Sequence, residues 1–286
     1  MRTVKHPGPR AARRVEAVRC EAFALEIQLK AGLSVNEAIA RGLADAGCSA
    51  GYVWLQDIAL TRLQYVIPAV SPDEEHIAWY STTRTMEPGT ILRAGCMAGW
   101  RDGQAFVHCH GLWDSGDGVR MGHLLPFESV VAEDCKARAW GIDGAAMVAR
   151  DDHETNFKLF AASAAPSTGS LMAGRRAVLA SVRPNEDLVA SIREIARLND
   201  LDRPDIFGIG SLVGCRLAGG GSLAWHANEA LIVSGSWDPS RADEPQIEIA
   251  LVDHSGQMVR GQLAPTGNAV SVTFELLLVG RQREPA

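Results

Sequence analysis

The 286-residue sequence lacks any run of about 18 consecutive apolar residues, the length that a transmembrane helix requires. Its first twenty residues also lack the continuous apolar segment of a secretory signal. The six cysteines include no Cys-x-x-Cys pair and no spacing typical of a disulfide framework. These absences predict a cytoplasmic protein with reduced thiols and no membrane partner.

Positive charge is in the minority, with 28 lysines and arginines against 34 acidic residues and a net charge of −6. Such a chain has no general affinity for a phosphate backbone, so nucleic acid is not an expected partner. Residues 1–19 are the exception, because six basic side chains there accompany one acid, Glu16. We expect a partly ordered basic arm over this range. An arm that binds DNA is the alternative.

Two segments of the chain, 153 residues apart, carry the same strand-then-helix pattern. In the first, Ser34 and Glu37 have the spacing of a capping box at the start of a helix. The shift superposes apolar positions of both helices: Val35 on Leu188 and Ile39 on Ile192. Both helices therefore bury the same stripe, and the chain is predicted to contain a tandem repeat.

Three histidines lie where a β-hairpin would bring them together. His108 and His110 are two residues apart, so both side chains leave the same face of a strand. A two-residue turn at Gly116 and Asp117 reverses the chain and places His123 opposite His110. Opposed Cβ atoms are about 4.5–5.5 Å apart, so three imidazoles can share one ion at roughly 2.0–2.1 Å per nitrogen.

A three-histidine set leaves one coordination position for water or substrate, which is typical of catalytic rather than structural zinc. We therefore predict one zinc ion per chain, although imidazoles also bind iron, nickel, cobalt and copper. The alternative is a cluster of buried imidazoles that bond to the backbone and have lowered pKa values. A cupin is disfavoured, because its acidic ligand would be Asp114, a turn residue.

The second repeat carries the same hairpin pattern without the histidines. Shifts of 138 residues before the turn and 139 after it pair the three histidines with Gln246, Glu248 and Gln262. This set has much poorer affinity for zinc, so the second copy is predicted to lack a metal. The decrease in shift from 153 to 138 implies fifteen extra residues in the first copy, which we assign to residues 65–89.

Other side chains are candidates for catalysis. Glu128, five residues after His123, is predicted as a general acid or base near bound water, with a rim carboxylate as the alternative. Tyr80 lies in the first-copy insertion and is predicted to orient the substrate, with surface packing as the alternative. Three arginines are candidates for holding an anionic substrate: Arg62, Arg93 and Arg101.

Three further features have competing interpretations. The polar segment 152–157 is either a contact from another copy to the site or a turn cap. Cys109 alternates with the histidines and is expected to be a buried packing thiol. Trp113 either lines the pocket or packs in the core.

The order of motifs resembles the plants-and-prokaryotes-conserved (PPC) domain. The resemblance rests on strand, helix, Gly-Ile-Gly-Ser at 208–211, hairpin, Gly-Gln-Leu at 261–263 and a long final strand. The first copy resembles the family through His108-x-His110 and Gly122-His123-Leu124. It implies an α+β fold with two tandem PPC-like domains, each a mostly antiparallel sheet with one or two packed helices. They would cover residues 20–162 and 175–282, with a linker at 163–174.

The resemblance also bears on function. Prokaryotic members of the family resemble metal-site proteins, whereas plant members join the domain to an AT-hook, and this chain has no Arg-Gly-Arg-Pro hook. The wider superfamily is similar to α-acetolactate decarboxylase and to a zinc-dependent ester hydrolase, which implies His108, His110 and His123 as ligands. Family members often form trimers. We expect a homo-oligomer, either a trimer or a dimer in which one chain's second copy covers its neighbour's pocket.

Together these features predict a zinc-type enzyme that acts on a small, anionic, carboxylated molecule. Hydrolysis of an ester, lactone or amide follows from polarisation of a carbonyl and activation of water. The same centre could chelate a 2-oxo or 2-hydroxy acid, so a decarboxylase or other lyase is one alternative. A non-catalytic ligand sensor or DNA-associated regulator is the other.

Overall fold

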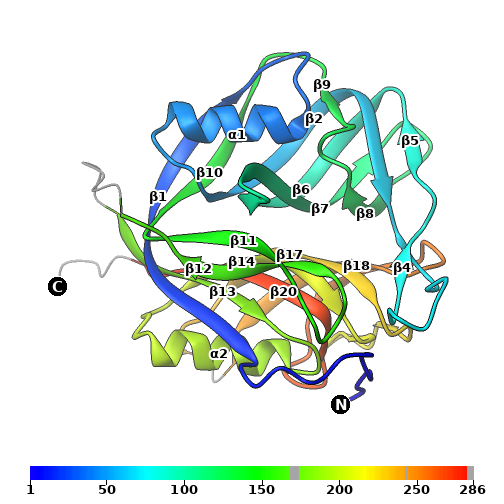
Figure 1. Cartoon of the computed structure of the whole chain (residues 1–286), viewed down its shortest axis with the longest axis vertical. Helices are drawn as coiled ribbons and strands as arrows, with labels where there is room; N and C mark the ends of the chain where they lie inside the picture. The colour runs from blue at the N-terminus through cyan, green and yellow to red at the C-terminus, as the bar shows by residue number, and fades with distance from the viewer. Residues whose placement is uncertain (168–173, 242–243, 282–286) are drawn as a thin grey trace.

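A computed structural model describes residues 1–167, 174–241 and 244–281. Within these ranges the regular structure is mostly β, with two short helices, α1 (Val35–Asp45) and α2 (Leu188–Leu198). The helices lie on opposite outer sides of the molecule, with the strands between them (Figure 1). Both have 11 residues and begin 153 positions apart, which confirms the repeat shift.

The starts of both helices follow from local sequence. The capping box is confirmed, since Oγ of Ser34 accepts a hydrogen bond from the backbone N of Glu37 and the Glu37 side chain accepts one from the backbone N of Ser34. At α2, the N-cap Asp187 accepts a hydrogen bond from the backbone N of Ala190 at 3.1 Å. The apolar stripes are buried as predicted.

The two repeats have the same order of strands. In the first repeat the pairing runs β1-β10-β2-β6-β7-β8, with β8 also pairing back onto β2, and in the second it runs β13-β20-β14-β17-β18-β19. The first-repeat strands are β1 (Val15–Leu29), β2 (Gly51–Val66), β6 (Gly89–Arg101), β7 (Gln104–Asp114), β8 (Arg120–Leu124) and β10 (Cys135–Asp143). Their counterparts are β13 (Arg175–Val182), β14 (Asp205–Leu212), β17 (Asn228–Ser236), β18 (Gln246–Val252), β19 (Met258–Gln262) and β20 (Val270–Val279).

Strand β1 joins the repeats into one large mixed sheet of 16 strands, which corrects the expectation of two separate sheets. Its residues 21–29 pair with β10, and its residues 15–22 pair with β13. A strand of this length extends about 50 Å, so it can form hydrogen bonds with an edge strand of each repeat. The larger hydrophobic core also includes Ile209, Leu231 and Leu277 of the second repeat. The repeats thus share both a sheet and a core.

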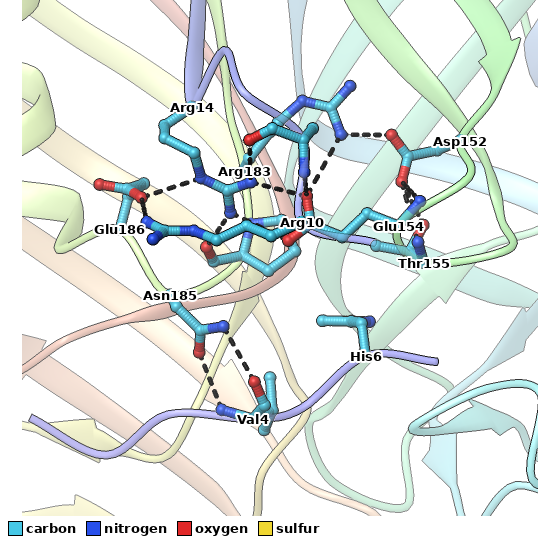
Figure 2. A network of polar contacts seen from close by, with 12 residues as sticks. Val4, His6, Arg10, Arg14, Asp152, Glu154, Thr155, Arg183, Asn185 and Glu186 are labelled. Carbon is cyan, nitrogen blue, oxygen red and sulfur yellow. Dashed lines mark hydrogen bonds and ion pairs between the residues drawn. The ribbon is translucent and has the colours of Figure 1, made fainter. Parts of the chain in front are cut away.

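The N-terminal segment is held against the second repeat rather than being a partly ordered tail. The backbone of Val4 exchanges two hydrogen bonds with the side chain of Asn185 (Figure 2). Arg14 forms ion pairs with Glu154 at 2.7 Å and with Glu186 at 3.0 Å. Strand β1 begins at Val15, inside the predicted arm of residues 1–19. Local sequence patterns did not predict this arrangement, because the partners of the segment are separated from it by about half of the chain length or more.

The extra length of the first repeat lies between the starts of β2 and β6. The starts of β2 and β14 are 154 residues apart, whereas those of β6 and β17 are 139 apart. Residues 65–89 hold only part of the difference of fifteen, because β2 itself has 16 residues and β14 has 8. Three short strands lie in this insertion: β3 (Pro68–Ala69), β4 (Trp79–Tyr80) and β5 (Arg84–Met86).

The remaining strands complete the described chain. They are β9 (Val130–Val131), β11 (Ala145–Asp151), β12 (Lys158–Ala164), β15 (Cys215–Arg216) and β16 (Ser222–Leu223). The first two residues of the predicted linker 163–174 belong to β12, and its residues 168–173 lie outside the described residues, as does the predicted domain end at 282. No helix in the described part of the chain is long and apolar enough to cross a membrane.

Candidate metal centre

The three histidines converge as the sequence predicts. His110 pairs directly with His123 across strands β7 and β8. One ligand atom from each of His108, His110 and His123 lies within 4.8 Å of the other two. The ring centroids are 4.6 to 5.3 Å apart. This group could therefore hold a metal ion.

The turn between the strands is longer than predicted. Strand β7 ends at Asp114 and β8 begins at Arg120, so a five-residue loop replaces the two-residue turn. Oδ1 of Asp114 accepts hydrogen bonds from the backbone N of Gly116 at 2.8 Å and of Gly118 at 3.1 Å. Both glycines have positive φ, which the loop requires. The Asp114 carboxylate is thus engaged in the loop, in agreement with the rejection of a cupin site.

The second repeat contributes two buried acids to the histidine cluster. Oε1 of Glu275, on β20, lies 2.7 Å from Nδ1 of His108. Oε2 of Glu229, on β17, lies 2.7 Å from Nε2 of His110. Nδ1 of His110 donates to the backbone O of Ala230 at 3.0 Å. Local sequence patterns did not predict these partners, which the second copy supplies within the same chain. The contact of a second copy with the pocket of a neighbouring chain stays a prediction.

The outer contacts orient two imidazoles toward each other. When Glu275 is ionised it accepts from Nδ1–H of His108, which leaves Nε2 of His108 without a proton. The bond to Ala230 does the same for neutral His110. The two Nε2 atoms are 3.0 Å apart. Two lone pairs at this distance repel unless a positive charge lies beside them, which either a proton on Nε2 of His110, 2.7 Å from Oε2 of Glu229, or a metal ion can supply. Outer acceptors of this kind are typical of metal-bound histidines.

Burial and mutual charge shift the pKa values of these groups in different directions. Burial, and then the charge of His110, lowers the pKa of His108 to about 3. Burial alone would lower the pKa of His110, but the carboxylate of Glu229 outweighs it and raises that pKa. Burial raises the pKa of Glu275 well above its ordinary value. A cation beside Glu275 would favour its ionised form.

The donor set fits a divalent cation. Nδ1 of His123 and Oε2 of Glu275 are buried and have no hydrogen-bond partner among the described residues. Within the same residues, no lysine or arginine forms an ion pair with Glu229 or Glu275. A cation on the three imidazoles would compensate these two buried carboxylates.

A cavity of about 520 Å³ opens onto the histidines, and both repeats line it. The predicted catalytic residues Glu128 and Tyr80 both line it as well. Glu128 is exposed at the rim, in the turn after β8. The ring of Tyr80 lies 5.2 Å from that of His123, between centroids. The structure thus brings both side chains to the same cavity as the histidines, and their catalytic roles stay predictions.

Of the three candidate arginines, only Arg101 lines this cavity. Nε of Arg62 donates to the backbone O of Glu128 at 2.9 Å. Arg93 donates to the backbone O of Val233 and lies in a different surface hollow. Arg62 and Arg93 therefore have structural partners within the chain and do not themselves line the cavity.

The segment 152–157 caps a turn, which confirms one of its two interpretations, and it also contacts the second repeat. Oδ1 of Asp152 caps a turn by accepting hydrogen bonds from the backbone N of Glu154 and of Thr155. The other carboxylate oxygen binds Arg183 of the second repeat (Figure 2). Phe157, at the end of the segment, lines the cavity. The segment therefore links a turn, the second repeat and the site.

The two packing predictions are confirmed. Cys109 is buried, and its Sγ lies 3.0 Å from Sγ of Cys96 on the neighbouring strand. Trp113 is fully buried with its ring 5.0 Å from that of Tyr65.

The hairpin of the second repeat keeps the register of the first. Glu248 pairs with Gln262 across β18 and β19, as His110 pairs with His123. Arg260 forms an ion pair with Glu248 at 2.8 Å. In the second repeat, the position equivalent to the histidine cluster is thus occupied by an ion pair at the surface.

No family model and no curated protein matches the chain. The metal-containing protein AF0104 from Archaeoglobus fulgidus is 22% identical, with a TM-score of 0.38 over 49% of this chain and 94% of that one. The PPC protein of Pyrococcus horikoshii is 12% identical, with a TM-score of 0.36 over 49% and 94%. A candidate DNA-binding protein from Ralstonia eutropha is 13% identical, with a TM-score of 0.37 over the same shares. The similarity concerns the fold and extends over about half of the chain.

Proposed function

We propose that this protein is a metal-dependent enzyme, with zinc as its metal, that hydrolyses an ester, lactone or amide of a small carboxylated molecule. The observation that carries the proposal is the convergence of His108, His110 and His123 beside a cavity of about 520 Å³. Three imidazoles suit zinc and leave a position for water or substrate.

The side chains have distinct roles in this proposal. The three histidines hold the ion, while Glu275 and the backbone O of Ala230 fix the orientation of two of them. A bound zinc ion would polarise the substrate carbonyl and lower the pKa of bound water towards about 7. Oε2 of Glu229 is the carboxylate oxygen nearest to His110, and it is placed to hold a proton released there.

Groups at the cavity supply the rest of the proposed chemistry. Tyr80 is placed to orient the substrate and Arg101 to bind its carboxylate. Glu128, at the exposed rim, is the second candidate for proton transfer. The aromatic and apolar lining limits access of water to the reacting bond.

The regulatory alternative has weaker support from the same molecule. Arg10 and Arg14 of the basic arm both form ion pairs with Glu186 at 3.0 Å. These arginines are thus engaged within the chain rather than free for phosphates. DNA titration across a salt series would test this, because binding through the arm requires steep salt dependence.

Metal analysis of purified protein tests the proposal. We expect about one equivalent of zinc per chain, lost in His110→Ala and retained in Glu248→Ala, which alters the equivalent position of the second repeat. Retention of the metal in His110→Ala would contradict the site. Turnover of an ester and lactone panel, with product analysis, then separates hydrolysis from loss of carbon dioxide, the product of a decarboxylase.

We also propose that the protein forms a homo-oligomer, either a trimer or a dimer, as the tandem copies suggest. Light scattering tests this directly, and a monomer at all concentrations would contradict it.

A further inference from the structure

The cavity above the histidines is unusually rich in aromatic side chains. The chain has seven phenylalanines, seven tryptophans and three tyrosines. Six of these residues line this one cavity: Trp79, Tyr80, Phe106, Phe127, Phe157 and Phe160. The larger apolar side chains of the lining are mainly aromatic, because only Leu125, Leu159 and Val272 accompany them among the larger aliphatic residues.

The most exposed aromatic side chains of the described residues also lie at this cavity. Trp79, Tyr80 and Phe127 are 40%, 41% and 50% exposed, and all other aromatic side chains of the chain are buried or half-buried. Each of the three lines the cavity. Exposed aromatic side chains collected at one opening are typical of a binding site, because folding alone gives no reason to leave them in water.

The aromatic residues form two groups, and each group reaches a predicted ligand. In the first, the rings of Trp79 and Phe157 are stacked at 5.7 Å between centroids, and Tyr80 lies 5.2 Å from His123.

The second group comes from β7, β12 and the turn after β8. The ring of Phe106 lies 6.1 Å from Phe127 and 5.6 Å from Phe160, and Phe160 lies 6.4 Å from His108. A planar ring bound in this cavity would therefore meet aromatic faces and edges beside the metal centre.

A cation lies on the same lining. The guanidinium carbon of Arg101 is 5.2 Å from the ring centroid of Phe106. Nε of Arg101 is 3.9 Å from Oδ2 of its acidic neighbour Asp102, which is at the outer limit of an ion pair. Arg101 can therefore bind a carboxylate without first breaking a short ion pair.

We propose that this cavity binds an aromatic carboxylate, with its ring between the two aromatic groups and its carboxylate on Arg101. Where the ligand is also the substrate, which rests on the proposed function, its reacting group faces the histidines. The volume of about 520 Å³ suits one small molecule rather than a polymer.

Calorimetric binding of a matched pair of acids tests the proposal. 2-Naphthoate and decahydronaphthalene-2-carboxylate share one carbon skeleton, but only the first is planar and aromatic. We expect 2-naphthoate to bind at least about fivefold more tightly. Equal affinity, or tighter binding of the saturated acid, would overturn the assignment of an aromatic subsite.

Variants locate the subsite. Phe127→Leu keeps an exposed apolar side chain and should weaken 2-naphthoate by about threefold while leaving the saturated acid unchanged. Arg101→Gln should weaken both acids by about fivefold. Leu198→Ala, which alters an exposed apolar side chain on α2 outside the cavity, is the control and should change neither. Normal 2-naphthoate binding by both cavity variants would place the ligand elsewhere.

The same titrations with metal-loaded and chelator-treated protein separate this inference from the proposed function. We expect 2-naphthoate to bind both forms, because neither the aromatic groups nor Arg101 depends on the ion. Binding of 2-naphthoate by a purified protein that takes up no metal even when zinc is added would support the subsite and contradict the metalloenzyme. Metal binding by a protein that shows no preference for 2-naphthoate over the saturated acid would support the metalloenzyme and contradict the aromatic subsite.

Discussion

Oε1 of Glu275 lies 2.7 Å from Nδ1 of His108, although 167 residues separate the two in the chain. Glu275 is 1% exposed, and the only hydrogen-bond partner of its side chain among the described residues is this histidine. The contact joins the last strand of the second repeat to the predicted ligand set of the first. It makes the metal centre a property of the whole chain rather than of one hairpin.

Replacement of Glu275 by glutamine should weaken metal binding by about 10- to 100-fold, because the neutral amide orients His108 less strongly and removes a compensating charge. Competition with a chelating dye measures this affinity. Glu248→Gln, on the equivalent hairpin strand of the second repeat, is the control and should bind metal normally. Unchanged affinity in Glu275→Gln would contradict an orienting role.

Gly122→Ala should also weaken metal binding. A Cβ at this position would lie 2.3 Å from the backbone O of Val66, so β8 would have to move away from β2 and carry His123 with it. Gly219→Ala is a suitable control, since a Cβ there meets no atom within 4 Å. Dye competition and thermal unfolding would report the two effects. A variant with normal affinity would show that the approach of these strands does not position His123.

The pairing of the N-terminal segment predicts a loss of stability in Arg14→Met. Arg14 is 15% exposed and Glu154 is 4% exposed, so removal of the guanidinium leaves a buried carboxylate without its main partner. We expect the free energy of unfolding to fall by about 3 kcal/mol in urea denaturation. Arg13→Met, at an exposed neighbouring position, should change it by less than about 0.5 kcal/mol. Equal stability of the two variants would contradict a stabilising role of the ion pair between Arg14 and Glu154.

Asp152 predicts a pH-dependent component of stability. Burial alone would raise the pKa of Asp152, but hydrogen bonds and charge from Arg183 and Thr155 outweigh burial and lower it. The pKa in the folded protein is therefore below the unfolded value, and this contribution is present above about pH 4 and lost as the pH falls further. Asp152→Asn should be less stable than the parent at pH 7, with a smaller difference at pH 3. A stability difference between Asp152→Asn and the parent that stays constant with pH would show that the ionised carboxylate of Asp152 does not stabilise the folded protein.

Local patterns predicted much of the fold and the centre of the site. The capping box at Ser34, the 153-residue shift and the pairing of His110 with His123 depend on residues close in sequence or on internal comparison. The five-residue loop after Asp114 escaped prediction because side-chain hydrogen bonds within the loop replace a tight turn.

Contacts between the repeats were beyond the reach of local pattern. The joining of the sheets through β1, and the approach of Glu229 and Glu275 to the histidines, depend on how two distant halves pack. One signal was present in the sequence, since each acid interrupts an otherwise mostly apolar strand, β17 or β20. An acid is rarely buried in such a strand without a cationic partner.

Because β1 fuses the two repeats, the acids that complete the histidine cluster are delivered by intramolecular folding. In an assembly of single-repeat subunits, an acid donated across an interface would be lost whenever the subunits separate at low concentration. Here dilution cannot remove Glu229 or Glu275 from the site, so its metal affinity should be independent of protein concentration.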